Sequence, residues 1–369
     1  MIVNNFDASN RNINDDDAAQ WYRKELLAPP IAGFGYRELS FRWVRYIFYI
    51  ALIAFFGYVI GVAGISAYVG RMVIRPTIKD IPPINVNIPV DYSSVNFKSF
   101  DNSTTLRGWL FKAPNAENIV IMVHDTGENR FQFGTDTLDI VRLFVDHDFS
   151  VLTFDLRNSG DSTAGISTFG LFEADDVLGA MAYAINSRYT NIVLYGFGAG
   201  ANAIMLASAK PTLEKAANSA VTQQLFDTIN NSVSAMILDT PITDIRGYIM
   251  KQLEEHEFIL PDFPFRYVVP LAVNLFINGD IFVVDDVDAF NSFIPRPVLI
   301  LRGGLDDMDN TAEFDRIEDM YNTYHSAAPG KISMWNDVES GYLESYVNSK
   351  ETYLEIISNF LDATFHAAP

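Results

Sequence analysis

The stretch LYGFGAGANAIM at residues 194–205 joins an apolar, β-rich run at 191–195 to an apolar helical pattern at 200–210. Between the two lie three glycines at alternate positions, Gly196, Gly198 and Gly200. Glycine adopts backbone angles that other residues avoid, so it suits a sharp change of chain direction. The stretch therefore predicts a strand, a tight turn and a helix in succession.

Units of the same kind recur on both sides of this stretch. Short apolar runs rich in β-forming residues lie at 107–112, 118–124, 149–155, 191–195, 234–239, 297–302 and 331–335. Helical patterns lie at 135–147, 172–187, 200–210, 311–325 and 349–365. Continuously apolar strands that alternate with helices predict a mostly parallel sheet with helices on both faces.

One globular domain, residues 86–366, accounts for all of these units. Two segments interrupt the alternation. Residues 211–232 read as a polar helical excursion, and residues 241–290 read as a helical cap placed between two strands. The prolines at 76, 82, 83 and 89 predict a stiff connector, and we place a linker at 71–85.

Residues 46–70 form a run of 25 positions without a charge. At 1.5 Å per residue such a helix is about 37 Å long, enough to cross a bilayer core of about 30 Å. The run is long for a signal peptide and begins late in the chain, whereas a buried core helix remains an alternative. We therefore predict a transmembrane helix at 46–70 that contacts the lipid bilayer.

The residues before this helix, 1–45, read as a polar tail followed by a basic approach to the membrane. Five basic residues lie in 23–45 and three follow the run, at Arg71, Arg75 and Lys79. This slight excess predicts a cytoplasmic N-terminus and places the globular domain, residues 86–366, on the outer (periplasmic or extracellular) side. The spacing of Gly57 and Gly61 is compatible with close packing of two such helices.

Composition narrows the classes of function. The net charge is -20, and residues 1–45 hold six basic and six acidic side chains, so the negative excess lies downstream. Such a surface repels phosphate backbones and disfavours nucleic-acid binding. The absence of cysteine removes disulfides, thiolate nucleophiles and cysteine-bound zinc.

Several loops after the predicted strands resemble those of one family. These are VHDTGENR at 123–130, FDLRNSGDS at 154–162, LYGFGAGANAIM at 194–205, LRGGLDDM at 301–308 and SGYLESY at 340–346, with FGLFEADDVLGAMAYA at 169–184 before the third. In this order they resemble the oxyanion turn, the following loop, the nucleophile elbow, the acid loop and the histidine segment of α/β-hydrolases, in particular of a membrane-anchored branch. The resemblance covers roughly 270 residues and implies the α/β-hydrolase fold.

The resemblance also implies which residues should carry the chemistry. The nucleophile position of the G-x-S-x-G elbow is Gly198, which has no side chain to attack a substrate. The acid position is Asp306, and the position of the catalytic histidine is Tyr342. A phenol titrates near 10 and is a poor base at neutral pH. Its hydroxyl could instead bond Asp306.

The oxyanion turn departs from the family as well. It reads His124, Asp125, Thr126, with Asp125 where the family has glycine. A carboxylate here would oppose the negative charge of an acyl-transfer transition state. We therefore expect no intact catalytic triad, no cofactor and no metal site.

Three hypotheses follow. The first is a pseudoenzyme: a membrane-tethered, catalytically inactive hydrolase-like protein that binds a small acyl or peptide ligand under the cap, or protein partners in a membrane or envelope assembly. The second is an active serine-type hydrolase (esterase, lipase or peptidase) with a rearranged site, in which His124 is the one plausible base. The third is a structural subunit of a larger membrane complex.

Overall fold

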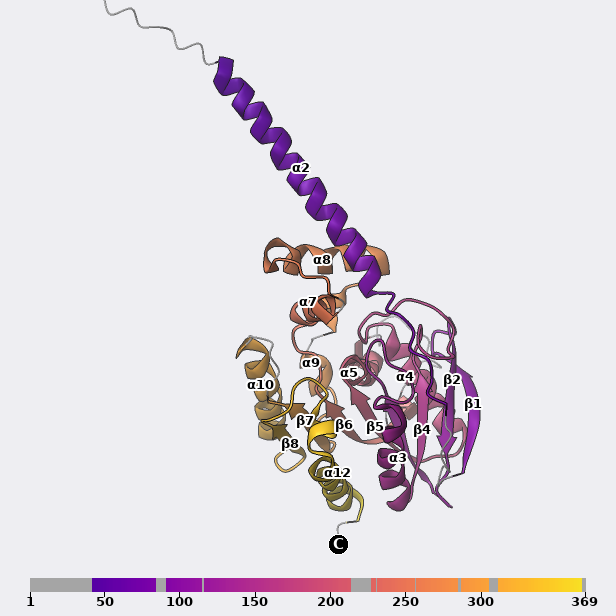
Figure 1. The fold of residues 1–369 in the computed structure, drawn as a ribbon. Helices are drawn as coiled ribbons and strands as arrows, with labels where there is room; N and C mark the ends of the chain where they lie inside the picture. The colour runs from indigo at the N-terminus through magenta and orange to yellow at the C-terminus, as the bar shows by residue number, and fades with distance from the viewer. Residues whose placement is uncertain are drawn as a thin grey trace, which may run out of the picture. The chain divides into compact units, whose positions relative to one another are not determined.

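The computed structural model describes residues 42–83, 91–114, 116–213, 227–229, 231–255, 257–284, 287–304 and 311–366. Residues 1–41 of the tail predicted at 1–45, most of the polar excursion at 211–232 and the loop that carries Asp306 lie outside these ranges. Figure 1 shows the described elements as a ribbon.

The centre of the molecule is a sheet of eight strands, β1 (Tyr92–Lys98), β2 (Thr105–Phe111), β3 (Asn118–Val123), β4 (Phe149–Asp155), β5 (Asn191–Phe197), β6 (Val233–Asp239), β7 (Val298–Gly303) and β8 (Ile332–Asp337). Their order is β1-β2-β4-β3-β5-β6-β7-β8. The pairs β1–β2 and β2–β4 are antiparallel, and every later pair from β4 to β8 is parallel. The predicted mostly parallel sheet is confirmed.

Helices cover both faces of the sheet because the strands are apolar on both sides (Figure 1). On one face, α3 (Thr137–Asp146) and α12 (Lys350–Phe365) pack over Val120, Val193 and Leu299. On the other face, α4 (Glu173–Asn186), α5 (Ala199–Leu213) and α10 (Thr311–Ala327) pack over the alternate residues of the same strands, among them Ile121, Leu194 and Ile300. This alternation places two cores on opposite sides of one sheet.

One strand was not predicted. β1 is exposed at nearly every position, and only its alternate residues Val95 and Phe97 are partly buried. An edge strand of this kind lacks the continuous apolar run by which the buried strands are found.

The predicted cap is helical. It contains α7 (Ile245–Glu255), α8 (Asp262–Ile277), a short 3₁₀ turn and α9 (Val287–Asn291), inserted between β6 and β7. Figure 1 shows α7 and α8 beyond one end of the strands. The cap therefore overhangs an edge of the sheet, where loops can form a site.

The predicted transmembrane segment is part of a longer helix, α2 (Arg42–Val73), which is long and apolar enough to cross a membrane. The chain divides into two units, Met1–Val59 and Ile60–Pro369, so the boundary falls within α2. In the first unit the described residues are helical and exposed. In the second, Val69, Gly70 and Val73 of the same helix are buried.

Candidate functional site

The turn between β5 and α5 has the geometry that the glycine pattern predicts. Gly198 lies there with a φ of +52°, a conformation that L side chains rarely adopt. Its N–H donates to the carbonyl oxygen of Asp239 at 2.9 Å. A Cβ on Gly200 would lie 2.3 Å from the carbonyl oxygen of Val123, so this position requires glycine for close backbone contact. The strand-turn-helix is thus kept with glycine at its apex.

The space above Gly198 is filled by the carboxylate of Asp125. A Cβ on Gly198 would lie 2.4 Å from Oδ1 of Asp125 and 2.1 Å from the hydroxyl of Tyr342. The N–H of Ala199, the residue after the apex, donates to Oδ1 of Asp125 at 2.8 Å. In an elbow of this type that N–H is a donor of the oxyanion hole. Asp125 therefore lies where a nucleophile's side chain would be, and it already accepts the hydrogen bond of one donor of the hole.

Two tyrosines hold this carboxylate from the other side. Tyr342 donates its hydroxyl to Oδ2 of Asp125 at 3.2 Å, and Tyr248 of α7 donates to Oδ1, also at 3.2 Å. The rings of the two tyrosines have centroids 5.9 Å apart. Lys251, one turn further along α7, places Nζ 4.6 Å from the centre of the Tyr342 ring. The cap thus contributes a hydrogen bond to the carboxylate through Tyr248 of α7.

Burial dominates the electrostatics of this group. Burial raises the pKa of Asp125 to about 6, while bonds from Ala199, Thr126 and the two tyrosines pull it down. Burial, together with the charge of Asp125, raises the pKa of Tyr248 and of Tyr342 well above the usual 10. Both phenols therefore remain protonated donors at neutral pH.

These contacts differ from what acyl transfer requires. The reaction needs a nucleophile beside a base, and donors aimed at a developing oxyanion. Here the apex has no side chain, the Ala199 donor is already bonded, and the nearby charge is negative. Tyr342 donates to Asp125 and so does not act as a proton acceptor.

His124 was predicted as the one plausible base of a rearranged site. Both of its ring nitrogens form hydrogen bonds with backbone atoms. Its Nε2 accepts from the N–H of Leu156 at 3.0 Å, and its Nδ1 lies 2.7 Å from the carbonyl oxygen of Asp125. This pattern fits a neutral ring that donates through Nδ1. Burial lowers its pKa. Neither nitrogen is available to a substrate.

A hydroxyl–imidazole pair lies elsewhere in the part of the chain that the structure describes. His147 Nε2 lies 2.9 Å from Oγ of Ser358, and Nδ1 lies 2.7 Å from the carbonyl oxygen of Leu143. His147 ends α3 and β4 begins two residues later, so the pair lies at the amino ends of the parallel strands. The elbow lies at the opposite, carboxyl ends. The pair joins α3 to α12 and does not complete the site.

Of the remaining predicted site residues, some lie outside the described part of the chain and others have partners that differ from those predicted. Asp306 lies outside the described residues, as does His256. The hydroxyl of Tyr342 goes to Asp125, whereas the sequence suggested Asp306 as its partner. Thr126 lines an open pocket together with Asp125. Within the described part of the chain no group of three histidine, aspartate or glutamate residues could hold a metal ion.

Tyr248 is the residue that sequence reasoning missed. It lies 123 positions from Asp125, in the cap, where several aromatic residues have equal claims from sequence alone. Only the fold brings its hydroxyl to the carboxylate. No local motif could have identified it.

An open pocket of about 490 Å³ lies directly over Asp125. Asp125 and Tyr342 line it, together with Phe133, Gln132 and Gln252. The connector after α2 closes one side; its lining residues are Pro76, Thr77 and Lys79. The connector is fixed there because Asn129 donates to the carbonyl oxygens of Lys79 and Asp80 at 3.4 and 3.2 Å.

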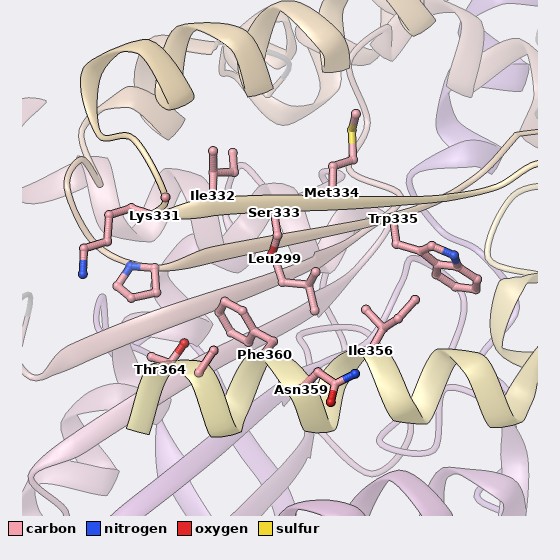
Figure 2. A pocket seen from close by; sticks show the side chains of 13 residues that line it. Leu299, Lys331, Ile332, Ser333, Met334, Trp335, Ile356, Asn359, Phe360 and Thr364 are labelled. Atoms are coloured by element: carbon pink, nitrogen blue, oxygen red, sulfur yellow. The ribbon is translucent and has the colours of Figure 1, made fainter. Parts of the chain in front are cut away.

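A second pocket, of about 500 Å³, lies between β8 and α12 (Figure 2). Leu299, Trp335, Ile356 and Phe360 contribute its apolar lining, and Lys331 is its one ionisable residue. Figure 2 shows these side chains between the strands and the helix. The pocket contains no acid–base pair, so the pocket over Asp125 is the better candidate for function.

Comparisons with known proteins agree on the fold. No protein-family model matches the sequence, and neither does any curated protein. Among solved structures, an esterase of Pyrococcus furiosus matches with a TM-score of 0.59 at 17% identity, covering 79% of this chain and 98% of that one. The α/β hydrolase GrgF from a Penicillium species matches with a TM-score of 0.52 at 17% identity, covering 75% of this chain and 100% of that one.

At such identities the likeness concerns the path of the backbone alone, and it agrees with the strand order, the elbow and the cap described above. The chain therefore has the α/β-hydrolase fold.

Proposed function

We propose that this chain is a membrane-tethered, non-catalytic member of the α/β-hydrolase fold that acts by binding. The observation that carries the proposal is the hydrogen bond from the Ala199 N–H to the Asp125 carboxylate, directly above Gly198. Asp125 thereby takes up the space of a nucleophile's side chain and also accepts the hydrogen bond of one oxyanion-hole donor.

The ligand site we propose is the pocket over Asp125. Its volume of about 490 Å³ lies within the range of small-molecule sites, about 300–1,000 Å³. Phe133 and Leu343 supply apolar contacts, and Gln132 and Gln252 supply amides. A small acyl or peptide molecule fits this mixture of surfaces.

The tether we propose is α2, with the N-terminus in the cytoplasm and the domain on the outer side. The helix is long and apolar enough to cross a membrane. The apolar run 46–70 within it has basic flanks on both sides, with the slight excess before the run. Protein partners in a membrane or envelope assembly remain part of this proposal, because the tail and α2 could both contact them.

The proposal is tested with a fluorophosphonate probe and with short acyl esters, on the purified full chain in detergent. We expect neither labelling nor hydrolysis, because the described site offers no activated hydroxyl. An active serine hydrolase of matched concentration is the positive control.

The rival hypothesis, a rearranged serine-type hydrolase, makes the opposite prediction. Ester hydrolysis that disappears in the His124→Ala variant, with the fold intact by circular dichroism, would show that the chain is an enzyme. That result would require His124 to leave both of its backbone partners.

A further inference from the structure

The cap helix α8 exposes one apolar face. Tyr267, Leu271 and Leu275 follow one another at intervals of four, and these residues are 53%, 54% and 84% exposed. Residues four apart lie on the same side of a helix. Phe263, just before the first full turn, is 75% exposed. The face is therefore continuous along the helix.

The opposite side of α8 meets α2 near Gly70. Val269 and Val273 on that side of α8 are buried, as are Val69 and Val73 of α2. A Cβ on Gly70 would lie 3.4 Å from the side chains of Ala272 and Val273, so the two helices meet closely at this glycine. These contacts lie within one unit of the chain, Ile60–Pro369.

The part of α2 in that unit is itself exposed and apolar just before the contact. Ile60, Ile65 and Tyr68 are 70%, 42% and 64% exposed. The first charge after the run is Arg71, which is exposed and lies one residue beyond the contact at Gly70. A charge that ends an apolar span marks the level of the headgroups. The contact with α8 is therefore at that level.

We propose that α8 is an interfacial helix whose face of Tyr267, Leu271 and Leu275 lies in the surface of the bilayer that α2 crosses. The proposal rests on the proposed tether. Helices of this kind bury an apolar face roughly 5–10 Å into the boundary between headgroups and acyl chains. The occupant of the face is lipid because the helix is joined to α2 where the apolar span ends.

The net charge of the chain favours a neutral lipid as the probe. The chain carries a net charge of -20, which an anionic surface repels. The contact we infer depends on apolar burial, so vesicles of phosphatidylcholine are sufficient to detect it.

The absence of cysteine makes the test direct. A single cysteine at Leu275 (Leu275→Cys) carries a fluorescent NBD label on the full chain in phosphatidylcholine vesicles. Doxyl groups on the lipid chains should reduce its emission about twofold, since the label would lie at the acyl boundary. Glu355→Cys, on the exposed surface of α12, is the matched control and should not be quenched.

Ile53→Cys, exposed within α2, separates failure of the tether from failure of the surface contact. Quenching at residue 53 but not at residue 275 would overturn the interfacial role while leaving the tether intact. Quenching at neither position would overturn both. Cysteine crosslinking between copies at residue 275, without lipid quenching, would show that the face binds a second copy and would also overturn the proposal.

A second variant tests the cause of quenching. Leu271→Glu places a charge on the same face without touching the buried side of α8. With the label at residue 275, this variant should lose most of the quenching while residue 53 stays quenched. Unchanged quenching in this variant would contradict burial of the α8 face.

Discussion

At the scale of single residues, Gly198 and Asp125 depend on each other. The apex of the elbow is glycine, with φ of +52°, and the carboxylate fills the volume that a side chain would need. A nucleophile cannot be restored at the apex unless Asp125 leaves. The two departures from the family pattern are therefore one structural change.

Gly198→Ser should give a less stable chain that still lacks activity. The new Cβ would meet Asp125 and Tyr342 at distances under 3 Å and would hold a strained backbone angle. Overpacking and positive φ together predict a loss of about 3 kcal/mol in the free energy of unfolding. Thermal denaturation and probe labelling test both parts. Gly330→Ser, also at positive φ but with open space around it, is the control for backbone strain.

Asp125→Asn should change how stability depends on pH. The pKa of Asp125 is raised from 3.8 to about 6 in the folded chain, so its protonation favours folding. The stability it contributes is fully present below pH about 4 and is lost as the pH rises through about 6. The free energy of unfolding of the variant, relative to that of the native chain, should therefore rise by up to about 3 kcal/mol between pH 4 and pH 8. Denaturation of both proteins across this range measures the difference, with Glu355→Gln as an exposed control.

Tyr342→Phe should raise the pKa of Asp125 further. The Tyr342 hydroxyl bonds Oδ2 and lowers the pKa of this carboxyl, so its removal favours the protonated form. The pH at which the Asp125 contribution is lost should then shift upward. The stability curves of Tyr342→Phe alone and combined with Asp125→Asn test this, and an unchanged midpoint would contradict it.

At the scale of elements, a buried ion pair fixes the loop after β3 to the end of β4. Arg130 donates through Nε and Nη2 to the Asp155 carboxylate, with distances of 2.5 to 3.2 Å, and both side chains are almost fully buried. The Arg130 backbone N–H donates to the same carboxylate at 2.8 Å. The same loop carries Asp125, five residues before Arg130, so the pair supports the site.

Arg130→Met should destabilise the fold by about 3–5 kcal/mol, because it leaves the Asp155 charge buried without its partner. The double variant Arg130→Met with Asp155→Asn should recover part of this loss. Chemical denaturation of the three proteins measures it. Equal losses in both variants would show that the charge is not the cause.

At the scale of the whole molecule, the membrane assignment depends on α2. Lysine at both residues 53 and 60 (Ile53→Lys and Ile60→Lys) should release the chain from membranes under alkaline extraction. Each lysine near the centre of a span costs about 3 kcal/mol of insertion. Ile78→Lys, in the connector after α2, is the control and should leave the chain in the membrane pellet. Retention of the double variant would contradict a span through α2.

The sequence by itself determined much of this protein. Apolar runs predicted seven of the strands to within two residues at each end, because strands buried on both faces must be continuously apolar. The glycines of the elbow predicted the tight turn, because a positive φ and close backbone contact favour glycine at these positions. The missing hydroxyl at Gly198 could also be recognised by position alone.

Only the tertiary structure decided what replaced the missing groups. Asp125 and Ala199 lie 74 positions apart, Asp125 and Tyr248 lie 123 apart, and Asp125 and Tyr342 lie 217 apart. Local patterns report backbone conformation and burial, whereas a hydrogen bond between distant residues depends on how the strand ends and the cap converge. The same holds for the exposed face of α8, because an apolar sequence does not reveal which side of a helix is left uncovered.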